Sequence, residues 1–474
     1  MPSHRSAWGP RLAWAAFILA DFLWCAWDGL AARFAPDDMM NMAKYWEKGF
    51  RELVAAQFDF TSYRPMGGLF YMPIFYFSGL DPFPYRLAIP LILVANIYLI
   101  YRFANYLSGS GLVAALAALA TSYHARLADI FYSTSVIYDI LCFTFFFAAF
   151  DWYLRRRSAG LSLRLRDTFL ILALYVCALN SKEMAVTLPV FLCLYECFYH
   201  PPGACRWAGI RDWVLVHAPV TLSASAVTLL YIYAKTHGAA ALAAVNGYRP
   251  ECSLRRFMES SQLEVNSILY LWDFFAGWKL VLVWVVLLAV AGWKRDRLLG
   301  FSWTFILLSP LPIVFLERRV HCCLYIPLAG WALFASAVFV ELVGRLARAL
   351  SRRAHASIVE AVLISAGVLL LGVTAAWNRQ SIVPTLAASQ ETTWAVIRQL
   401  RNLDPKVAPG SKVLFVDDPF EQWDMYFIAR LWFRDRTLEL RLQRKLSLPE
   451  SEIAEMDYIF QFRGSTLTQV KPPN

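Results

Sequence analysis

The feature of this sequence that most restricts its fold is a series of long apolar runs. Apolar residues make up 58% of the 474 positions, and the mean hydropathy is +0.45. A helix of about 20 apolar residues crosses the roughly 30 Å hydrocarbon core of a bilayer, and several runs reach that length. The runs exclude a soluble globular fold and predict an α-helical multi-pass membrane protein of about eleven spans.

The spans are expected to alternate with loops whose basic residues mark the cytoplasmic side. Arginines cluster at residues 155–166 and recur at 206–211, 294–297 and 345–353. They predict a cytoplasmic N-terminus, an uncleaved first span and an extracytoplasmic C-terminus, and they favour a bacterial inner membrane over the endoplasmic reticulum. We place the spans at about residues 11–32, 87–107, 112–127, 133–154, 168–179, 184–198 and 213–234, in three runs that end near 294, 317 and 345, and at 358–377.

The net charge of +10 does not indicate a nucleic-acid-binding protein. The arginines lie in short clusters between apolar runs, as the positive-inside rule requires, so the lipid bilayer is the expected partner. Cys252, Cys322 and Cys323 fall in or near extracytoplasmic segments, where free thiols or one disulfide are both consistent with the sequence.

Two domains are expected. Residues 1–377 form the membrane domain, whose long outer loops are residues 33–86 and 235–273. Residues 378–474 form a small extracytoplasmic α/β module. Its helices are expected at 389–403 and 422–433 and its strands near 412–418, 438–442 and 457–462, with Asp417 and Asp418 in the turn after the first strand.

Two adjacent carboxylates, Asp37 and Asp38, lie in the first outer loop, just beyond the first span. Carboxylates beside the membrane surface can act as general bases on a lipid-borne substrate. Aspartates at the start of the segment MMNMAKYW are equally consistent with a helix N-cap. The residues alone leave both interpretations open.

Other ionisable residues gather on the same expected face. Because ionisable groups at span ends are costly, each is a functional candidate. Carboxylates could deprotonate an acceptor hydroxyl, while lysine and arginine could neutralise a phosphate leaving group, which suits group transfer from a lipid phosphate. The alternatives are headgroup anchoring for the arginines, a local ion pair for the Lys-Glu sequence and a structural hydrogen bond for the histidine. The candidates are Arg64, His124, Asp129, Lys182, Glu183, Glu317, Arg318 and Arg319.

The segment from residue 62 to 101, which begins SYRPMGGLFYMP, resembles the transmembrane-and-tetratricopeptide O-mannosyltransferases of the GT-C glycosyltransferase superfamily. That superfamily also holds the protein O-mannosyltransferases and the lipid A aminoarabinose transferases. The aspartate pair, a Tyr63-Arg64-Pro65 sequence and a Pro-Phe-x-Tyr sequence occur in the family's order. The tetratricopeptide repeats are missing, so the resemblance covers the membrane part.

Further positions match the family more loosely. His124, Asp129 and Asp139 keep the family's spacing, with Asp129 where Glu is usual. The family's Lys-Glu pair is matched by Lys182 and Glu183. Its Glu-Arg sequence and the following Tyr-x-Pro are met only at a longer spacing, by Glu317, by Arg318 or Arg319, and by Tyr325 and Pro327.

The resemblance implies an inverting glycosyltransferase that moves a sugar, such as mannose, from a polyprenyl-phosphate donor to an extracytoplasmic acceptor. Asp38, slightly favoured over Asp37, would be the base, because Asp37 beside Pro36 is expected to be the cap. Asp129 would orient the acceptor, and Tyr63 and Tyr325 are further site candidates. Cations would stabilise the donor phosphate as it leaves, namely Arg64, Lys182 and either Arg318 or Arg319.

No cofactor is required by this interpretation, although the two aspartates could hold Mg²⁺ or Mn²⁺. The acceptor is open among protein, glycan and lipid. The main alternative is a transporter or flippase of lipid-linked saccharides, but the two halves of the chain show no inverted repeat or corresponding broken spans. A non-catalytic assembly subunit is the second alternative.

Overall fold

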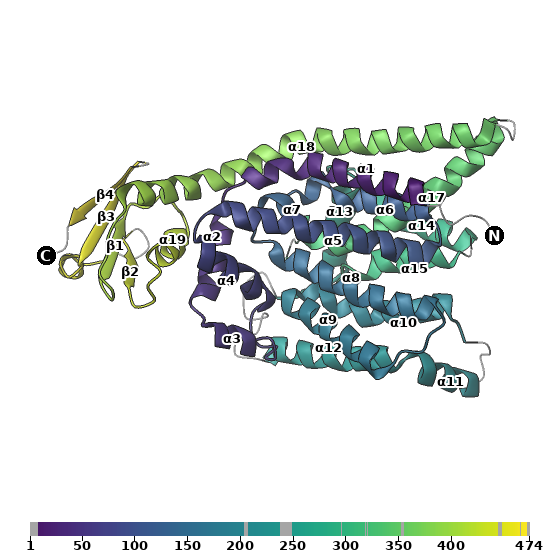
Figure 1. Ribbon diagram of the computed structural model, residues 1–474, viewed down its shortest axis with the longest axis horizontal. Coiled ribbons are helices and arrows are strands. Elements are labelled where there is room, and N and C mark those ends of the chain that lie inside the picture. The colour runs from purple at the N-terminus through teal and green to yellow at the C-terminus, as the bar shows by residue number, and fades with distance from the viewer. Residues whose placement is uncertain are drawn as a thin grey trace.

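The computed structural model describes residues 8–202, 207–237, 249–294, 296–317, 319, 321–351, 355–443, 448–464 and 466–471. They form a bundle of roughly parallel helices with a small mixed sheet at one end (Figure 1). We call the end of the bundle that carries the sheet the module end.

The helices of the bundle confirm the multi-pass membrane fold. Each of the eleven expected spans falls on a helix or on a helix pair. Six described helices are long and apolar enough to cross a bilayer, or seven if a pair bent by 68° at residue 218 counts as one span. The bundle helices are α1 (Trp8–Ala26), α5 (Pro82–Ser108), α6 (Gly111–Ser122), α8 (Ile137–Ser158), α9 (Leu165–Ser181), α10 (Leu188–Tyr199), α11 (Trp207–His217), α12 (Pro219–His237), α14 (Trp278–Lys294), α15 (Arg297–Leu308), α17 (Tyr325–Leu350) and α18 (Ala356–Leu403).

Local sequence sets where these helices begin and end. The Asp81 carboxylate accepts a hydrogen bond from the Phe83 amide at the start of α5, and Pro82 occupies the first helical position. Gly109 ends α5 in the left-handed region, with φ of 66°, a conformation that glycine adopts without strain. The Ser110 hydroxyl then caps α6 through the Val113 amide, so the SGSG sequence makes a tight hairpin.

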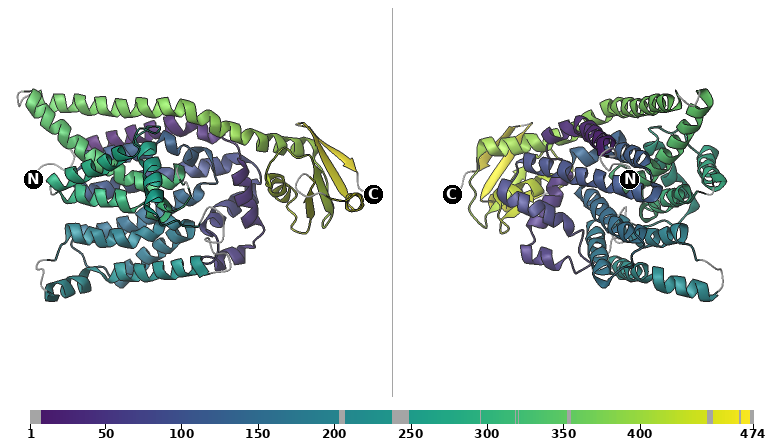
Figure 2. Two further views of the ribbon diagram at one scale, coloured as in Figure 1. Left: turned by 180° about the vertical axis from the view of Figure 1, so that it is seen from behind. Right: turned by 45° about the vertical axis from the view of Figure 1, so that its right-hand side comes forward.

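Short helices connect the long ones and gather largely toward the module end (Figures 1 and 2). Together they make the surface on which the candidate residues lie. They are η1 (Trp27–Ala31), α2 (Pro36–Trp46), α3 (Phe50–Ala55), α4 (Met66–Ser78), η2 (Ala125–Leu127), α7 (Asp129–Tyr132), η3 (Glu183–Thr187), α13 (Leu254–Ile268), α16 (Leu311–Val314) and η5 (His321–Leu324).

The last bundle helix joins the membrane part to the module. Helix α18 is 48 residues long. At about 1.5 Å per residue it extends over roughly 72 Å, far more than a bilayer core needs. It runs along the whole bundle and on to the sheet (Figure 1). The change of composition expected at residue 377 therefore lies inside a continuous helix.

The module holds a four-stranded sheet of order β2-β1-β3-β4. Strands β1 (Lys412–Val416), β2 (Glu439–Leu442) and β3 (Tyr458–Arg463) are parallel, and β4 (Thr466–Lys471) is antiparallel to β3. The sequence predicts the first three strands and α19 (Asp424–Phe433) but not β4. The expected turn after β1 is present, because the Asp418 carboxylate accepts from the Phe420 amide at 3.1 Å, as aspartates in turns commonly do. Helix α20 (Glu450–Ala454) completes the module.

The module is attached to the short helices as well as to α18. The Arg434 guanidinium lies 4.9 Å from the centre of the Phe75 ring at the end of α4. The Arg436 guanidinium lies over the Trp46 ring at 5.0 Å and donates to the Trp46 carbonyl oxygen. These cation–π contacts fix the module against the segment that carries the two adjacent aspartates.

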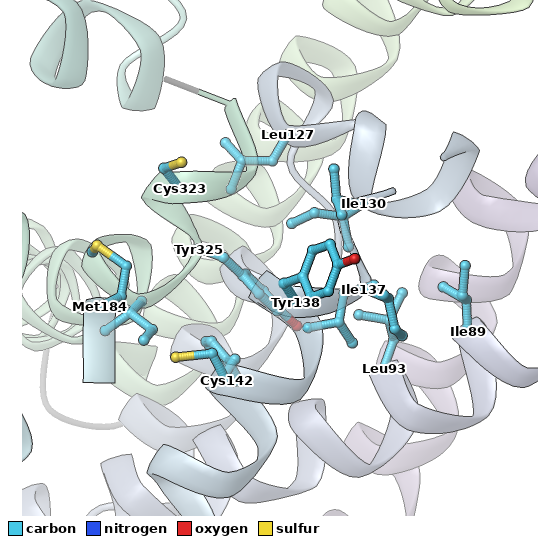
Figure 3. Close-up of a cluster of buried hydrophobic side chains, with 14 of the residues drawn as sticks. Ile89, Leu93, Leu127, Ile130, Ile137, Tyr138, Cys142, Met184, Cys323 and Tyr325 are labelled. Atoms are coloured by element: carbon cyan, nitrogen blue, oxygen red, sulfur yellow. The ribbon is translucent and has the colours of Figure 1, made fainter. Parts of the chain in front are cut away.

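Figure 3 shows a cluster of buried hydrophobic side chains in the bundle. Ile89 and Leu93 come from α5, Ile137 and Cys142 from α8, and Met184 from η3. Because a close-packed interior resists movement, side chains that project from this cluster are held in place.

Candidate active site

Several charged residues predicted from the sequence line one cavity of about 260 Å³. Four elements that are distant in sequence converge on it: the start of α4, the α9–η3 junction, the end of α12 and the α16–η5 segment. Its charged lining residues are Arg64, Lys182, Glu183, Lys235 and Arg319. We call this cavity the cation pocket.

Arg64 is fixed by aromatic and ionic contacts. Its backbone has φ of 43°, an uncommon left-handed conformation for a non-glycine residue. Its guanidinium donates to both oxygens of Glu183, at 3.3 and 2.7 Å, and lies 4.7 and 5.4 Å from the ring centres of Tyr63 and Tyr138. Burial alone would raise the pKa of the Glu183 carboxyl, but Arg64 holds it below its ordinary value.

Lys182, which precedes η3, forms an ion pair with Asp139 of α8. Its ammonium donates to both oxygens of Asp139, each at 2.5 Å, and lies 3.3 Å from the Cys323 sulfur. Burial opposes the charge of Lys182, but Asp139 holds the pKa of the ammonium well above its usual value. Lys182 is therefore charged, with Asp139 as its counter-ion. The described cysteines, Cys252, Cys322 and Cys323 among them, are free thiols.

Lys235 lines the pocket but is not among the residues predicted from the sequence. Its ammonium donates to the Ser62 carbonyl oxygen at 2.6 Å. Among the described residues, no carboxylate lies within salt-bridge distance of it. A lysine at the end of an apolar run, where α12 reaches a long polar loop, is the sequence signal that would have identified it.

Cationic side chains predominate in the lining of the pocket. Four of them line it, and two carboxylates contact them, Glu183 in the lining and Asp139 behind Lys182. Cations gathered in a partly desolvated cavity attract an anion, because the low dielectric there screens charges less than water does.

Asp38 is a buried anchor within the first loop. One carboxylate oxygen accepts from the Ala35 amide at 2.8 Å and pairs with Arg86 at 3.3 Å; the other accepts from the Ser133 hydroxyl at 3.0 Å and the Ser135 amide at 2.6 Å. The capping role expected for Asp37 thus belongs to Asp38, because Pro36 begins α2 and places Asp38 at the third position, where a side chain reaches back to the N-cap amide.

Asp37 is exposed, and among the described residues nothing hydrogen-bonds its carboxylate. Asn41 and Lys44 lie four and seven residues further along α2, on the same helix face. The Asn41 side-chain oxygen accepts from the Tyr138 hydroxyl at 2.9 Å, and the Lys44 ammonium lies 3.5 Å from the centre of the Tyr63 ring. The part of this face that carries Asn41 and Lys44 thus contacts the aromatic residues around Arg64. We call the face of α2 that carries Asp37, Asn41 and Lys44 the Asp37 face.

The surroundings of this face change the acidity of two of its groups. Partial burial, with a contribution from the charge of Asp38, raises the pKa of the Asp37 carboxyl. Burial, together with Arg64, Lys48 and Lys235, lowers the pKa of the Lys44 ammonium to about 8. Both shifts favour the neutral form, so this face holds an acid and a base that exchange protons nearer to neutral pH than usual.

Other predicted residues lie outside the pocket lining. His124 stacks on Tyr270 at 4.2 Å and contacts the Ile268 carbonyl oxygen at 3.1 Å. The Asp129 carboxylate accepts from the Cys322 amide at 3.2 Å, and Tyr325 stacks on Phe143 at 3.9 Å. Glu317 is exposed. Arg318 lies outside the described residues.

The two adjacent aspartates do not offer the ligand set of a magnesium or manganese site. Both oxygens of Asp38 are already engaged by four donors, and they face the protein interior. Among the described residues, the group with metal-ligand spacing is Asp139, Cys322 and Cys323. Two of its three donors are soft sulfurs, which do not suit Mg²⁺ or Mn²⁺, and the Lys182 ammonium already lies against Asp139.

Neither models of protein families nor curated proteins match this chain. Solved structures are similar to it, and two of them are of one protein. ArnT from Cupriavidus metallidurans bound to undecaprenyl phosphate matches with a TM-score of 0.55 and 13% identity, over 92% of this chain and 86% of that chain. The apo state of the same protein gives 0.52 and 12%, over 91% and 86%. The likeness confirms the expected α-helical multi-pass membrane fold with its small C-terminal module, and shows that this chain shares the fold of ArnT. The closer resemblance to O-mannosyltransferases stays a prediction.

Proposed function

We propose that this protein is a glycosyltransferase that takes a sugar from a polyprenyl-phosphate donor and transfers it, with inversion, to an acceptor hydroxyl. The observation that carries the proposal is the convergence of four cationic side chains, from separate elements of the fold, on the cation pocket. The leaving group of the transfer is a phosphate monoester, which carries up to about two negative charges at neutral pH and which these cations would stabilise.

The donor assignment has two supports. ArnT, whose fold this chain shares, has been crystallised with undecaprenyl phosphate. In this chain the donor phosphate would lie among Arg64, Lys182, Lys235 and Arg319, which line one cavity. Arginine offers a planar fork to phosphate oxygens, whereas lysine acts as a point charge, and the pocket supplies both. The sequence resemblance makes mannose the first sugar to test.

We propose Asp37 rather than Asp38 as the general base. Asp38 is buried and its lone pairs are used, whereas Asp37 is exposed on the face of α2 that points toward Arg64. In the transfer, the acceptor hydroxyl loses its proton to the Asp37 carboxylate while its oxygen bonds to the anomeric carbon. The bond from that carbon to the phosphate oxygen breaks, and the electron pair goes to the phosphate, which the cation pocket stabilises.

The site is proposed to face the extracytoplasmic side. The arginines at the ends of α8 and α17 lie at the other end of the bundle, away from the module (Figure 1). By the positive-inside rule that end is cytoplasmic, so the C-terminal module lies outside, as expected for a bacterial inner-membrane protein.

The test is transfer of radiolabelled sugar from undecaprenyl-phosphate mannose and related donors by the purified full chain in lipid. Asp37→Asn should reduce transfer by about 10²- to 10⁴-fold, the usual contribution of a general base. Undecaprenyl phosphate binding, measured separately, should be retained, because the cation pocket is unchanged.

Asp59→Asn is the matched control. Asp59 is an exposed aspartate of the same loop that accepts hydrogen bonds only from its neighbours Thr61 and Ser62 among the described residues. Its substitution should leave transfer near the wild-type rate. Transfer by Asp37→Asn at the wild-type rate would refute the proposed base, and a wild type that moves labelled lipid across the bilayer without transfer would favour a flippase.

A further inference from the structure

A second and larger cavity lies on the opposite side of the bundle from the cation pocket. It has a volume of about 1020 Å³ and runs between α1, α6 and α18. The two cavities share no lining residue. In Figures 1 and 2, α1 and α18 run along one edge of the bundle, and α12, which lines the cation pocket, lies along the other. We call the larger cavity the α1–α18 groove.

The groove exists because α18 carries small residues where it passes α1. Gly372 lines the groove, and a Cβ added to it would meet nothing within 4 Å. Gly367, five residues earlier, is different: its Cβ would lie 2.4 Å from the Phe339 ring, so this glycine permits close packing of α18 on α17. One face of α18 thus packs against α17, and the face that passes α1 lines the groove.

The groove has the length and the exposure of a lipid site. Its lining extends along α18 from Ala361 to Arg379. This stretch of helix measures roughly 27 Å, close to the hydrocarbon thickness of a bilayer. Trp24 and Leu369 line the groove and are 80% and 68% exposed, so it opens sideways at the face of the bundle that meets lipid.

The module end of the groove is polar. Tyr123, at the end of α6, is 5% exposed, and its hydroxyl has no hydrogen-bond partner among the described residues. Arg379 lines the same end; its Nη2 pairs with Asp28, while its Nε is buried without a described partner. Deeper in the groove lies the half-buried carboxylate of Asp21. A buried hydroxyl and a guanidinium nitrogen without partners point to a polar head that completes their hydrogen bonds.

From these features we infer that the α1–α18 groove binds the chain of an anionic acyl lipid, with its head at Tyr123 and Arg379, and that this lipid is the sugar acceptor. The second part rests on the proposed function. Under the proposed function the donor phosphate is held elsewhere, because the cations that receive it line the other cavity. A single guanidinium already paired with Asp28 also suits the one negative charge of a phosphodiester better than the two of a monoester.

The polar end is joined to the proposed base through one segment of chain. Tyr123 begins the segment that continues through η2 and α7 to Ser133 and Ser135, whose hydroxyl and amide hold Asp38. Asp37 is the neighbouring residue. A head group held at Tyr123 therefore lies on the segment that anchors the start of the helix of the proposed base.

Gly372→Trp tests the binding, because a Cβ at this position meets nothing within 4 Å and a large side chain there would occupy the groove. The matched control is Leu370→Trp, since Leu370 is 67% exposed on the same helix and does not line the groove. The purified full chain is offered equal amounts of dioleoylphosphatidylglycerol and undecaprenyl phosphate, and bound lipid is read by native mass spectrometry. We expect retention of phosphatidylglycerol by wild type and Leu370→Trp and at least a tenfold loss in Gly372→Trp, with undecaprenyl phosphate bound equally by all three.

Loss of undecaprenyl phosphate in Gly372→Trp would overturn the assignment, because the groove would then hold the donor chain. Equal phosphatidylglycerol retention by all three proteins would overturn it as well. The acceptor role is read from radiolabel in the lipid, glycan and protein fractions of membranes. Label in the acyl-lipid fraction that falls tenfold in Gly372→Trp alone supports that role, and label confined to protein or glycan refutes it. A wild type that transfers nothing refutes the proposed function and the acceptor role, while the binding result stands by itself.

Discussion

Replacing Asp38 by asparagine should destabilise the fold, whereas replacing its neighbour Asp37 should not. The Asp38 carboxylate and the Arg86 guanidinium form an ion pair in which neither side chain is exposed. Removing one partner of a buried pair leaves an uncompensated charge, which costs about 3–5 kcal/mol. Arg86 also donates to the Ala32 and Arg33 carbonyl oxygens, so we expect the lower end of that range, about 3 kcal/mol.

The assay is reversible unfolding of the purified chain in mixed micelles, followed by tryptophan fluorescence, for wild type and both single variants. Asp37→Asn should lie within about 0.5 kcal/mol of wild type, as surface substitutions usually do. Arg86→Met in the Asp38→Asn background should recover part of the loss, because the double variant no longer buries an unpaired charge.

Two results would refute this reasoning. If Asp38→Asn is as stable as wild type, the four hydrogen bonds and the ion pair do not anchor the first loop. If Asp38→Asn is stable and loses transfer while Asp37→Asn keeps it, the base and the anchor have been assigned in the wrong order.

Three further predictions concern the candidate site and the C-terminal module. Arg64→Lys should weaken undecaprenyl phosphate binding by about tenfold, since a lysine cannot keep the paired contacts of the guanidinium to Glu183 while stacking on Tyr63. Unchanged binding of undecaprenyl phosphate in a titration would contradict this prediction. The transfer rate should rise with pH through the raised pKa of Asp37, because only the carboxylate form accepts the proton. The acid limb of the pH–rate profile should therefore lie above the ordinary aspartate pKa near 4, and a limb at or below that value would contradict the prediction. Gly79→Ala should loosen the module and expose the α18–β1 connection to protease, because a Cβ at residue 79 would lie 2.5 Å from the Arg434 guanidinium. The control is Gly109→Ala, where φ is similarly positive but the space around the Cβ is open, and this variant should resist protease like wild type.

The membrane fold could be predicted from the sequence because lipid imposes a single rule on it. Backbone groups in hydrocarbon must be hydrogen-bonded within their own helix, so an apolar run of sufficient length is a helix whatever it packs against. Each expected span accordingly falls on a helix or a helix pair. Strand β4 was not predicted because the apolar residues of Thr466–Lys471 are Leu467 and Val470, whose spacing breaks the alternation of a strand, and its pairing depends on β3 rather than on its own pattern.

The candidate site was only partly predictable. Arg64, Lys182 and Glu183 could be chosen because charges at span ends are costly and therefore informative. Lys235 escaped notice because a lysine at a helix end is usually an anchor in the headgroups, and only the fold shows that it turns into the pocket. The sequence also could not show that Lys182 pairs with Asp139, since α8 and α9 are brought together by packing.

The division between Asp37 and Asp38 shows why such a site needs the fold. Adjacent residues on a helix point about 100° apart, so two identical side chains next to each other meet different surroundings. One carboxylate meets Arg86 and two serines and becomes part of the interior, whereas the other remains exposed on the next face of α2. The buried aspartate holds the start of α2 against the Ser133–Ser135 segment and so fixes the helix that carries the exposed aspartate. The proposed base and its anchor can be neighbours in sequence because a helix begins here, with one face on the protein and the next face open.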